Sequence, residues 1–196
     1  MFKAADENSL PVRDRILNAA EQIVARDGVA NLTLDAVAKE TGVSKGGLLY
    51  HFPSKSALIT QIVERMANRC ESEQLKAIEG QPPLPGSFTR AYLKARSEGP
   101  EPQRIPIQCA LLAAAGTDPE YLNPFRNRAL QWQAKLESDG IDPAIATIVR
   151  LAIDALCLQA MLGMPVPQGE LRQQVMQKLL AMTHPEDSDQ RKESAP

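Results

Sequence analysis

The residues best suited to binding chemistry lie between Ser44 and Lys55, in the segment SKGGLLYHFPSK. This segment contains two lysines and no acidic residue, whereas the whole chain of 196 residues has 22 Lys+Arg, 24 Asp+Glu and a formal net charge of -2. Any anionic partner must therefore be met by a local patch such as this one. The adjacent glycines, Gly46 and Gly47, disfavour a helix by about 1 kcal/mol each relative to alanine. They also leave a bare surface where backbone N–H groups can approach phosphate, so the segment predicts contact with DNA; a mobile loop is the alternative interpretation of the glycine pair.

Other kinds of site are not supported by the residue pattern. The three cysteines, Cys70, Cys109 and Cys157, are odd in number and far apart, which argues against a disulfide framework and a metal-ligand cluster. The two histidines, His51 and His184, have no cysteine or carboxylate at ligand spacing. The chain also lacks a glycine-rich phosphate loop, a nucleophile beside a histidine and paired carboxylates at a recognisable site. We therefore expect no enzyme activity, no metal and no cofactor.

Apolar residues recur at helical spacing along almost the whole chain, and no segment alternates long enough to form a convincing strand. Proline and glycine gather at 80–86, 99–106 and 163–169, which predicts loops there. The expected fold class is all-α, with about nine helices. No stretch reaches the roughly 18 to 20 consecutive apolar residues of a membrane span, and the start of the chain is charged. This pattern predicts a cytoplasmic protein with no membrane partner, ending in a disordered tail at 184–196 that has no large apolar side chain.

Two short helices between 33 and 52 have the spacing of a helix-turn-helix. A small side chain at Ala38 allows a close helix crossing, Gly42 can take the positive φ of the turn, and Leu48 fills the gap between the helix axes. The second helix would then be a recognition helix, whose N-terminal residues enter the major groove. An amphipathic helix that begins near Pro11 completes a three-helix DNA-binding domain.

Over residues 13–59 the sequence resembles the N-terminal DNA-binding domain of the TetR family of bacterial transcriptional regulators. The resemblance rests on the stretch ILNAAEQIVARDGVANLTLDAVAKETGVSKGGLLYHFPSKSALI. This stretch combines a first helix ending in glycine, a threonine cap on the second, the turn G-V-S-K-G, and Tyr-His-Phe before a capped lysine. Beyond about residue 60 the chain matches the family only in helical content and length.

The resemblance also implies roles for individual residues. Lys45 and Gly47 would face base edges, and the DNA backbone would be held by Thr33, Tyr50, His51 and Lys55. Because the glycine pair leaves few side chains for bidentate base contacts, sequence discrimination would rest on Ser44, Lys45 and DNA shape. A half-buried aromatic is the alternative interpretation of Tyr50, and a surface histidine or a helix cap is that of His51. The predicted DNA-binding set is Thr33, Ser44, Lys45, Gly46, Gly47, Tyr50, His51 and Lys55.

A recognition helix of two turns reads too few base pairs for specificity in a genome. A dimer that places two such helices about 34 Å apart is therefore expected on a palindromic operator. The best candidate for the dimer face is 142–163, which is apolar almost all round, followed by the amphipathic segment 168–183. With their copies these would make a four-helix interface, as the resemblance also implies; burial inside a monomer is the alternative. The predicted interface residues are Ile145, Ile148, Val149, Ala152, Leu156, Leu171, Val175 and Leu179.

Residues 87–138 supply most of the aromatic and large apolar side chains outside the DNA-binding domain, and three alanines at 113–115 leave room beside them. They predict a mostly apolar effector pocket, although the same residues at helical spacing suit an ordinary core. Arg96 and Arg104 either meet an anionic group of the effector or are solvated charges near loops. The predicted pocket residues are Phe88, Tyr92, Cys109, Leu112, Phe125 and Trp132.

These features predict three parts, a helix-turn-helix domain at 11–56, a helical effector-binding and dimerisation domain at 57–183, and the tail. The expected function is that of a dimeric, sequence-specific transcriptional regulator. Family analogy favours a repressor that a small-molecule effector releases from its operator. The alternatives are a DNA-binding regulator without a small-molecule response, one that responds to oxidation through Cys109, and a structural DNA-binding protein.

Overall fold

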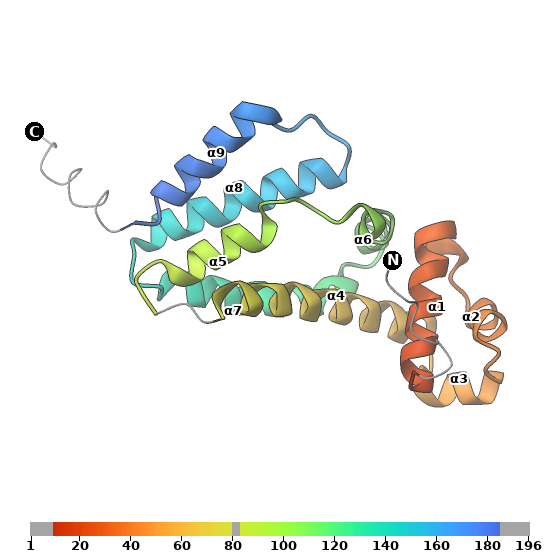
Figure 1. The fold of residues 1–196 in the computed structure, drawn as a ribbon. Coiled ribbons are helices and arrows are strands. Elements are labelled where there is room, and N and C mark those ends of the chain that lie inside the picture. The colour runs from red at the N-terminus through yellow and green to blue at the C-terminus, as the bar shows by residue number, and fades with distance from the viewer. Residues whose placement is uncertain (1–9, 80–82, 185–196) are drawn as a thin grey trace, which may run out of the picture. The chain divides into compact units, whose positions relative to one another are not determined.

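The computed structural model describes residues 10–79 and 83–184 (Figure 1). These residues form nine α-helices and no strand, which confirms the predicted all-α fold. The predicted tail lies outside the described residues from 185 onward. In chain order the helices are α1 (Val12–Asp27), α2 (Leu34–Thr41), α3 (Lys45–His51), α4 (Lys55–Ile78), α5 (Ser87–Arg96), α6 (Ile105–Ala115), α7 (Asn123–Glu137), α8 (Pro143–Met161) and α9 (Gly169–Ala181).

The chain divides into two compact units. Unit 1 comprises Met1–Ala67 and Pro102–Phe125, and unit 2 comprises Asn68–Glu101 and Arg126–Pro196. Helix α6 packs with the N-terminal helices, and α4 belongs to unit 1 at its start and to unit 2 at its end.

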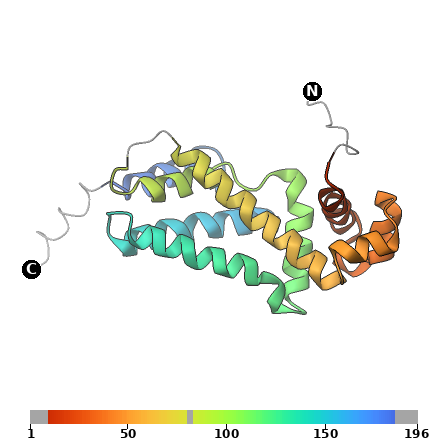
Figure 2. The same ribbon diagram turned by 90° about the horizontal axis from the view of Figure 1, so that it is seen from below.

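In unit 1, α1, α2 and α3 lie together (Figure 2), and their buried apolar residues belong to one shared core. The stripe of α1 faces this core because its apolar residues recur every three or four positions. Helix α6 lies against α1 and adds the buried Leu111, while Tyr121 and Phe125 pack at the edge of the same core. The other buried residues of this core include Ile16, Leu17, Ala20, Ile23, Val24, Val37, Leu48, Phe52, Leu58, Ile59 and Ile62.

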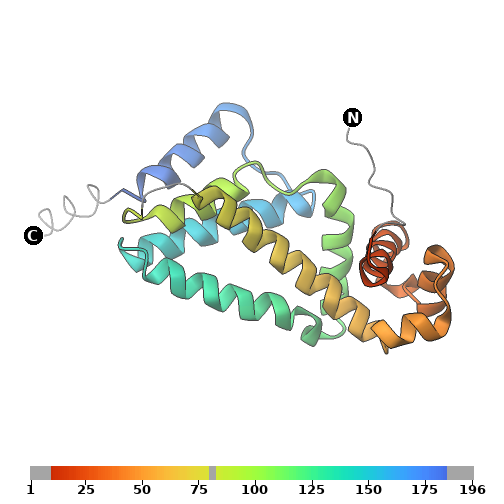
Figure 3. The same cartoon turned by 60° about the horizontal axis from the view of Figure 1, so that its bottom comes forward.

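In unit 2, α5 and α8 pack against each other (Figure 3). The start of α5 is held by Asp139, whose carboxylate accepts hydrogen bonds from the N–H groups of Phe88 (3.0 Å) and Thr89 (2.7 Å) and from the Thr89 hydroxyl (2.7 Å). Backbone donors that α5 itself cannot satisfy are thus satisfied from the loop after α7. The core of unit 2 includes Ala91, Tyr92, Leu93, Trp132, Leu136, Ala146, Val149 and Ile153.

Gly86 precedes α5 at the most crowded turn of unit 2. Its φ is 78°, a left-handed conformation that side chains rarely adopt, and its N–H donates to the carbonyl of Asp139 at 2.7 Å. A Cβ at this position would lie 2.4 Å from the carbonyl oxygen of Thr183, to which Arg90 also donates a hydrogen bond (3.0 Å). The turn therefore requires glycine for its conformation and for its space.

Helix α8 is apolar on two opposite sides. Val149 and Ile153 are fully buried, whereas a second stripe of large apolar residues is about half exposed: Ile148, Leu151, Leu158 and Leu162. By length and composition α8 could cross a membrane: its mean hydropathy is 1.7, and 17% of that window is buried within the structure. The sequence predicted no such segment, because Arg150 and Asp154 interrupt the apolar run.

Candidate nucleic-acid interface

Hydroxyl caps set the start of both helices of the predicted helix-turn-helix. The Thr33 Oγ1 accepts the N–H of Ala36 at 3.1 Å where α2 begins, and the Ser44 Oγ accepts the N–H of Gly47 at 3.2 Å where α3 begins. Between the helices Gly42 has a φ of 69°, the left-handed conformation that glycine adopts without strain. These local features explain why a chain segment this short forms two separate helices.

Helix α3 turns one face to the core of unit 1 and the other outward. Leu48 of α3 and Val37 of α2 are fully buried and fix the crossing of the two helices. On the outer face the Tyr50 side chain is 86% exposed, which disagrees with the half-buried alternative. His51 is half-buried, and its ring meets the edge of the Tyr50 ring with the centroids 5.2 Å apart. The outer face of α3 therefore offers an aromatic ring and a hydroxyl to a partner.

The two glycines of α3 differ in their surroundings. A Cβ at Gly46 would meet nothing within 4 Å, so this position is open surface. A Cβ at Gly47 would lie 3.2 Å from both the capping Ser44 Oγ and the Val43 side chain. Gly46 leaves a bare surface, as expected for close approach to a groove wall, while a side chain at Gly47 would crowd the capping Ser44 and Val43.

Lys45, the cation of the recognition helix, is held by an acidic residue of the other helix. Its Nζ lies 2.8 Å from Oδ1 of Asp35 on α2, and both side chains are mostly exposed. An exposed pair of this kind contributes about 1 kcal/mol or less to stability. It does restrict where the Lys45 ammonium points, so Asp35 belongs to the site although it is not in the predicted DNA-binding set.

We expect Asp35→Asn to raise the affinity for DNA of any sequence, because it removes a negative charge and releases Lys45 toward phosphate. The slope of log K against log salt should become steeper by up to about one phosphate contact. Fluorescence anisotropy on random duplex DNA at several salt concentrations measures both quantities. Glu40→Gln is the matched control, because it makes the same change in net charge on α2 at a residue that pairs with Arg26 of α1. Equal effects from the two variants would show that Asp35 has no specific hold on Lys45.

Lys55 is the first residue of α4 and is anchored to the backbone. Its Nζ donates to the carbonyl of Ala30 at 3.1 Å, which ties the start of α4 to the segment before Thr33. An ammonium group has three donors, so this bond leaves two for a DNA phosphate. The structure thus holds the Lys55 ammonium beside Ala30, three residues before Thr33 in the sequence.

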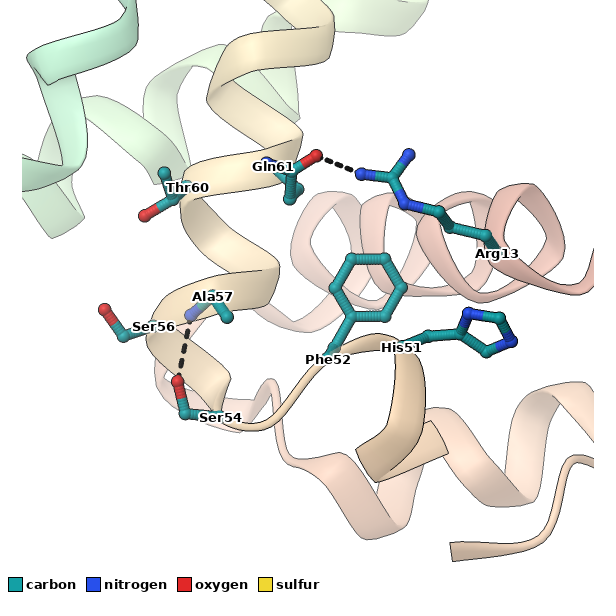
Figure 4. Close-up of a pocket in the computed structure, with 8 residues that line it drawn as sticks. All are labelled: Arg13, His51, Phe52, Ser54, Ser56, Ala57, Thr60 and Gln61. Carbon is teal, nitrogen blue, oxygen red and sulfur yellow. Dashed lines mark hydrogen bonds between the residues drawn. The ribbon is translucent and has the colours of Figure 1, made fainter. Parts of the chain in front are cut away.

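Arg13 is a basic residue beside this site that sequence reasoning missed. Figure 4 shows it reaching from α1 toward α4, where it donates a hydrogen bond to Gln61 and lies with its guanidinium carbon 5.5 Å from the centre of the Phe52 ring. It borders a surface pocket of about 520 Å³. The signal in the sequence is an arginine in the first turn of the first helix. The pocket is lined by Arg13, His51, Phe52, Ser54, Ser56, Ala57, Thr60 and Gln61.

Two family models match the chain. The family model described as bacterial regulatory proteins, tetR family, matches residues 16–62, and the model described as Tetracyclin repressor-like, C-terminal domain, matches residues 86–184. The chain belongs to the TetR family. The resemblance seen at 13–59 is confirmed, and the chain is a helix-turn-helix transcriptional regulator.

Relatives with curated names match the DNA-binding part of this TetR-family chain. The HTH-type transcriptional regulator UidR of Escherichia coli is 39% identical over 70 residues, which is 36% of this chain and 36% of UidR. The match therefore spans about a third of that relative's length.

Solved structures cover more of the chain at lower identity. A putative transcriptional regulator from Streptomyces coelicolor has a TM-score of 0.70 and 20% identity, covering 88% of this chain and 99% of its own. The multidrug binding protein EbrR, complexed with imidazole, has a TM-score of 0.58 and 23% identity, covering 87% of this chain and 96% of its own. At these identities the structures establish a shared TetR-family fold.

The predicted effector residues are distributed over both units. Cys109, Leu112 and Phe125 belong to unit 1, where Phe125 packs against the core beneath the helix-turn-helix. Phe88, Tyr92 and Trp132 belong to unit 2. Tyr92 and Trp132 are buried there with their rings edge to face and the centroids 6.2 Å apart.

The predicted interface residues of this TetR-family chain divide between two sides of α8. Val149 is fully buried within unit 2, while Ile145, Ala152 and Leu156 are partly buried. Of the predicted α8 residues, Ile148 is the one that lies on the exposed apolar stripe. On α9, Leu171 is 57% exposed, Val175 is half-buried and Leu179 is buried.

Proposed function

We propose that this TetR-family protein acts in the cytoplasm as a homodimeric repressor that binds a palindromic operator and leaves it when a small-molecule effector binds. The observation that carries the proposal is the outer face of α3, where Tyr50 is 86% exposed beside an open Gly46 and a lysine at the N-terminal end. An aromatic hydroxyl and lysine on the exposed side of a recognition helix suit contacts to phosphate and base edges.

Homodimerisation is supported by the outward side of α8. Its stripe of Ile148, Leu151, Leu158 and Leu162 has the spacing of three or four residues that a partner helix fills. Four half-exposed large apolar side chains on one stripe exceed the scattered single residues usual on a monomer surface. We therefore place the dimer face on this stripe rather than on the buried Val149.

Release by an effector is supported by the position of α6. Because α6 packs on α1 and places Leu111 in the core of unit 1, any displacement of α6 changes the support of the helix-turn-helix directly. A ligand that binds one arrangement of α6 more tightly shifts the equilibrium by that difference in affinity. The structural neighbour named as a multidrug binding protein agrees with small-molecule recognition on this fold.

Selection of bound fragments from genomic DNA tests the proposal. The purified protein should enrich fragments that share a palindrome, and binding to that palindrome should survive excess competitor DNA at physiological salt. A protein that enriches fragments without a shared palindrome would instead be a structural DNA-binding protein.

We expect Tyr50→Ala to weaken binding to the selected operator and to unrelated DNA alike, by about tenfold, because a hydrogen bond to a charged oxygen is lost. Tyr50→Phe is the matched control, since it keeps the ring and removes the hydroxyl. If the hydroxyl binds phosphate, the phenylalanine variant loses most of the same affinity. Anisotropy titrations on both kinds of DNA measure this, and unchanged affinity in both variants would contradict the assignment of Tyr50 as a DNA contact.

A further inference from the structure

Unit 2 contains an arginine held between aromatic rings. The guanidinium carbon of Arg96, at the end of α5, lies 3.9 Å from the centre of the Tyr92 ring and 5.3 Å from the centre of the Trp132 ring. Its Nε lies 3.3 Å from a carboxylate oxygen of Asp154 on α8, and its side chain is 15% exposed. Stacking of this kind holds a guanidinium in a fixed plane and leaves its edge available for hydrogen bonds.

The surroundings of Arg96 have more positive than negative charge. Asp154 is the acidic residue of α8, and its two oxygens accept the Tyr92 hydroxyl at 2.8 and 3.0 Å. Burial raises the pKa of that hydroxyl above its usual value, so it remains a donor. Arg150, one turn before Asp154, reaches the same carboxylate only at 3.8 Å. One carboxylate therefore faces two guanidinium groups, Arg96 and Arg150, and α5 supplies no acid.

A third arginine lies in the same region. Arg172 of α9 donates a hydrogen bond to the carbonyl of Ser97, the residue that follows α5, at 2.6 Å. Cys157 of α8 donates to the carbonyl of Arg96 at 3.6 Å. Burial raises the pKa of the Cys157 thiol, and the positive charges of Arg96 and Arg172 oppose that rise. The three arginines thus converge on one part of unit 2.

One buried donor of this arginine cluster (Arg96, Arg150 and Arg172) has no acceptor among the described residues. The Nε of Arg150 is buried and makes no hydrogen bond with any residue that the structure describes. Donors on a charged group that lack acceptors destabilise the fold. Their natural partner is a planar or tetrahedral anion, because the guanidinium edge matches carboxylate and phosphate.

A neutral polar group without a partner lies in the same unit. Gln74 of α4 is 2% exposed, and neither its side-chain oxygen nor its nitrogen has a partner among residues 10–79 and 83–184. Asn68 and Glu71 of α4 both bind Arg128 of α7. One turn further along both helices come Gln74 and the buried Trp132, whose ring lies next to Arg96. By this register, Gln74 is on the side of unit 2 that leads toward the arginine cluster.

We propose that the arginine cluster is the effector site of unit 2 and that it takes a small organic anion, whose acidic group binds the guanidinium edges of Arg96 and Arg150 while its body extends toward Gln74. This inference rests on the proposed release by an effector. An anion at these arginines competes with Asp154 and so weakens the tie between α5 and α8. Since α8 carries the exposed apolar stripe, the change reaches the dimer face.

Thermal unfolding of the full chain at constant ionic strength tests the class of ligand. The probes share one alkyl chain and differ in the head group: hexanoate, hexyl phosphate, hexanamide and hexylamine. We expect hexanoate or hexyl phosphate at millimolar concentration to raise the Tm, and the neutral amide and the amine to leave it unchanged. Stabilisation by the amide or the amine equal to that by the anions, or no stabilisation by either anion, overturns the proposal.

Variants locate the binding. Arg96→Gln and, separately, Arg150→Gln should weaken binding of the stabilising anion about tenfold or more in calorimetry, because each removes a charge-assisted hydrogen bond. Lys94→Gln is the matched control, since Lys94 is an exposed basic residue on the same helix as Arg96. If Arg96→Gln fails to fold, Arg150→Gln alone decides. Unchanged affinity in every folded arginine variant overturns the assignment of the site.

Gln74→Met separates ligand binding from a structural role. Removing a buried polar group without a partner should raise the Tm of the protein without ligand, yet reduce the further increase that the anion produces. A lower Tm without ligand, together with an unchanged increase on adding the anion, would show that Gln74 serves the fold alone and would remove it from the site.

Operator binding distinguishes this inference from the proposed function. If the anion binds at Arg96 and Arg150 but leaves operator affinity unchanged at saturation, the site is supported and release by this effector is rejected. If instead an amine or a neutral compound releases the operator equally well from the parent protein and from Arg150→Gln, release is supported and the anion site is rejected.

Discussion

Replacing Leu151 and Leu158 together with glutamate is expected to give a monomer that has lost most of its operator affinity. Both leucines lie on the exposed stripe of α8, at 54% and 45% exposure. In a homodimer each substitution occurs twice, so four buried leucines are lost, at about 1.5 kcal/mol or more each, and four charges face an apolar surface. The folded protomer should survive, because neither residue belongs to the core of unit 2.

The loss of operator affinity follows from geometry. A dimer binds its second half-site as an intramolecular event, which increases affinity by about a hundredfold or more over one recognition helix. Light scattering during size-exclusion chromatography gives the oligomeric state, and anisotropy with the operator gives the affinity. Leu130→Glu on α7 is the control, since Leu130 is 71% exposed but lies on another helix. A double α8 variant that remains dimeric would show that the dimer face lies elsewhere.

Gly86→Ala is expected to destabilise the protein more than the same change at any other glycine that the structure describes. Alanine would have to adopt a φ of 78°, and its Cβ would lie 2.4 Å from the carbonyl oxygen of Thr183. The left-handed conformation disfavours alanine by about 1 to 2 kcal/mol, and the crowding adds about 1 to 3 kcal/mol. Because the neighbouring atom is backbone, relief would require moving the end of α9 or the turn before α5.

Urea unfolding at a fixed protein concentration measures the expected loss. Gly163→Ala is the matched control, because Gly163 has a φ of 68° and a Cβ there would meet nothing within 4 Å. This control measures the loss of unfolding free energy that comes from the left-handed conformation alone, about 1 to 2 kcal/mol. Equal losses in the two variants would mean that the turn at Gly86 relaxes without resistance.

The helix-turn-helix could be predicted from sequence because its determinants are local. A capping hydroxyl acts within three residues, and the glycine turn and the buried Leu48 complete the motif within a short segment. The contacts that sequence reasoning missed are those between elements. Asp35 of α2 forms an ion pair with Lys45 of α3. Arg13 of α1 donates a hydrogen bond to Gln61 of α4, which is 48 residues further along the chain.

Unit 2 could be predicted only in part. The sequence shows that α8 is apolar, but the side that α8 buries depends on where α5 packs. This packing buries Val149 and leaves Leu151 exposed. The aromatic residues were assigned together to an apolar pocket, yet Tyr92 and Trp132 enclose the charged Arg96. Arg96 can be buried because it pairs with Asp154. That residue is distant in sequence, and the spacing of apolar residues along a helix does not reveal such a pair.

The position of Leu111 has a consequence for the evolution and engineering of this regulator. Leu111 of α6 completes the core against which α1 packs. The helix-turn-helix domain therefore cannot be transferred as the first 60 or so residues alone without exposing apolar surface. A chimera that transplants operator preference onto another TetR-family body must carry 102–125 with it, or supply a substitute for Leu111.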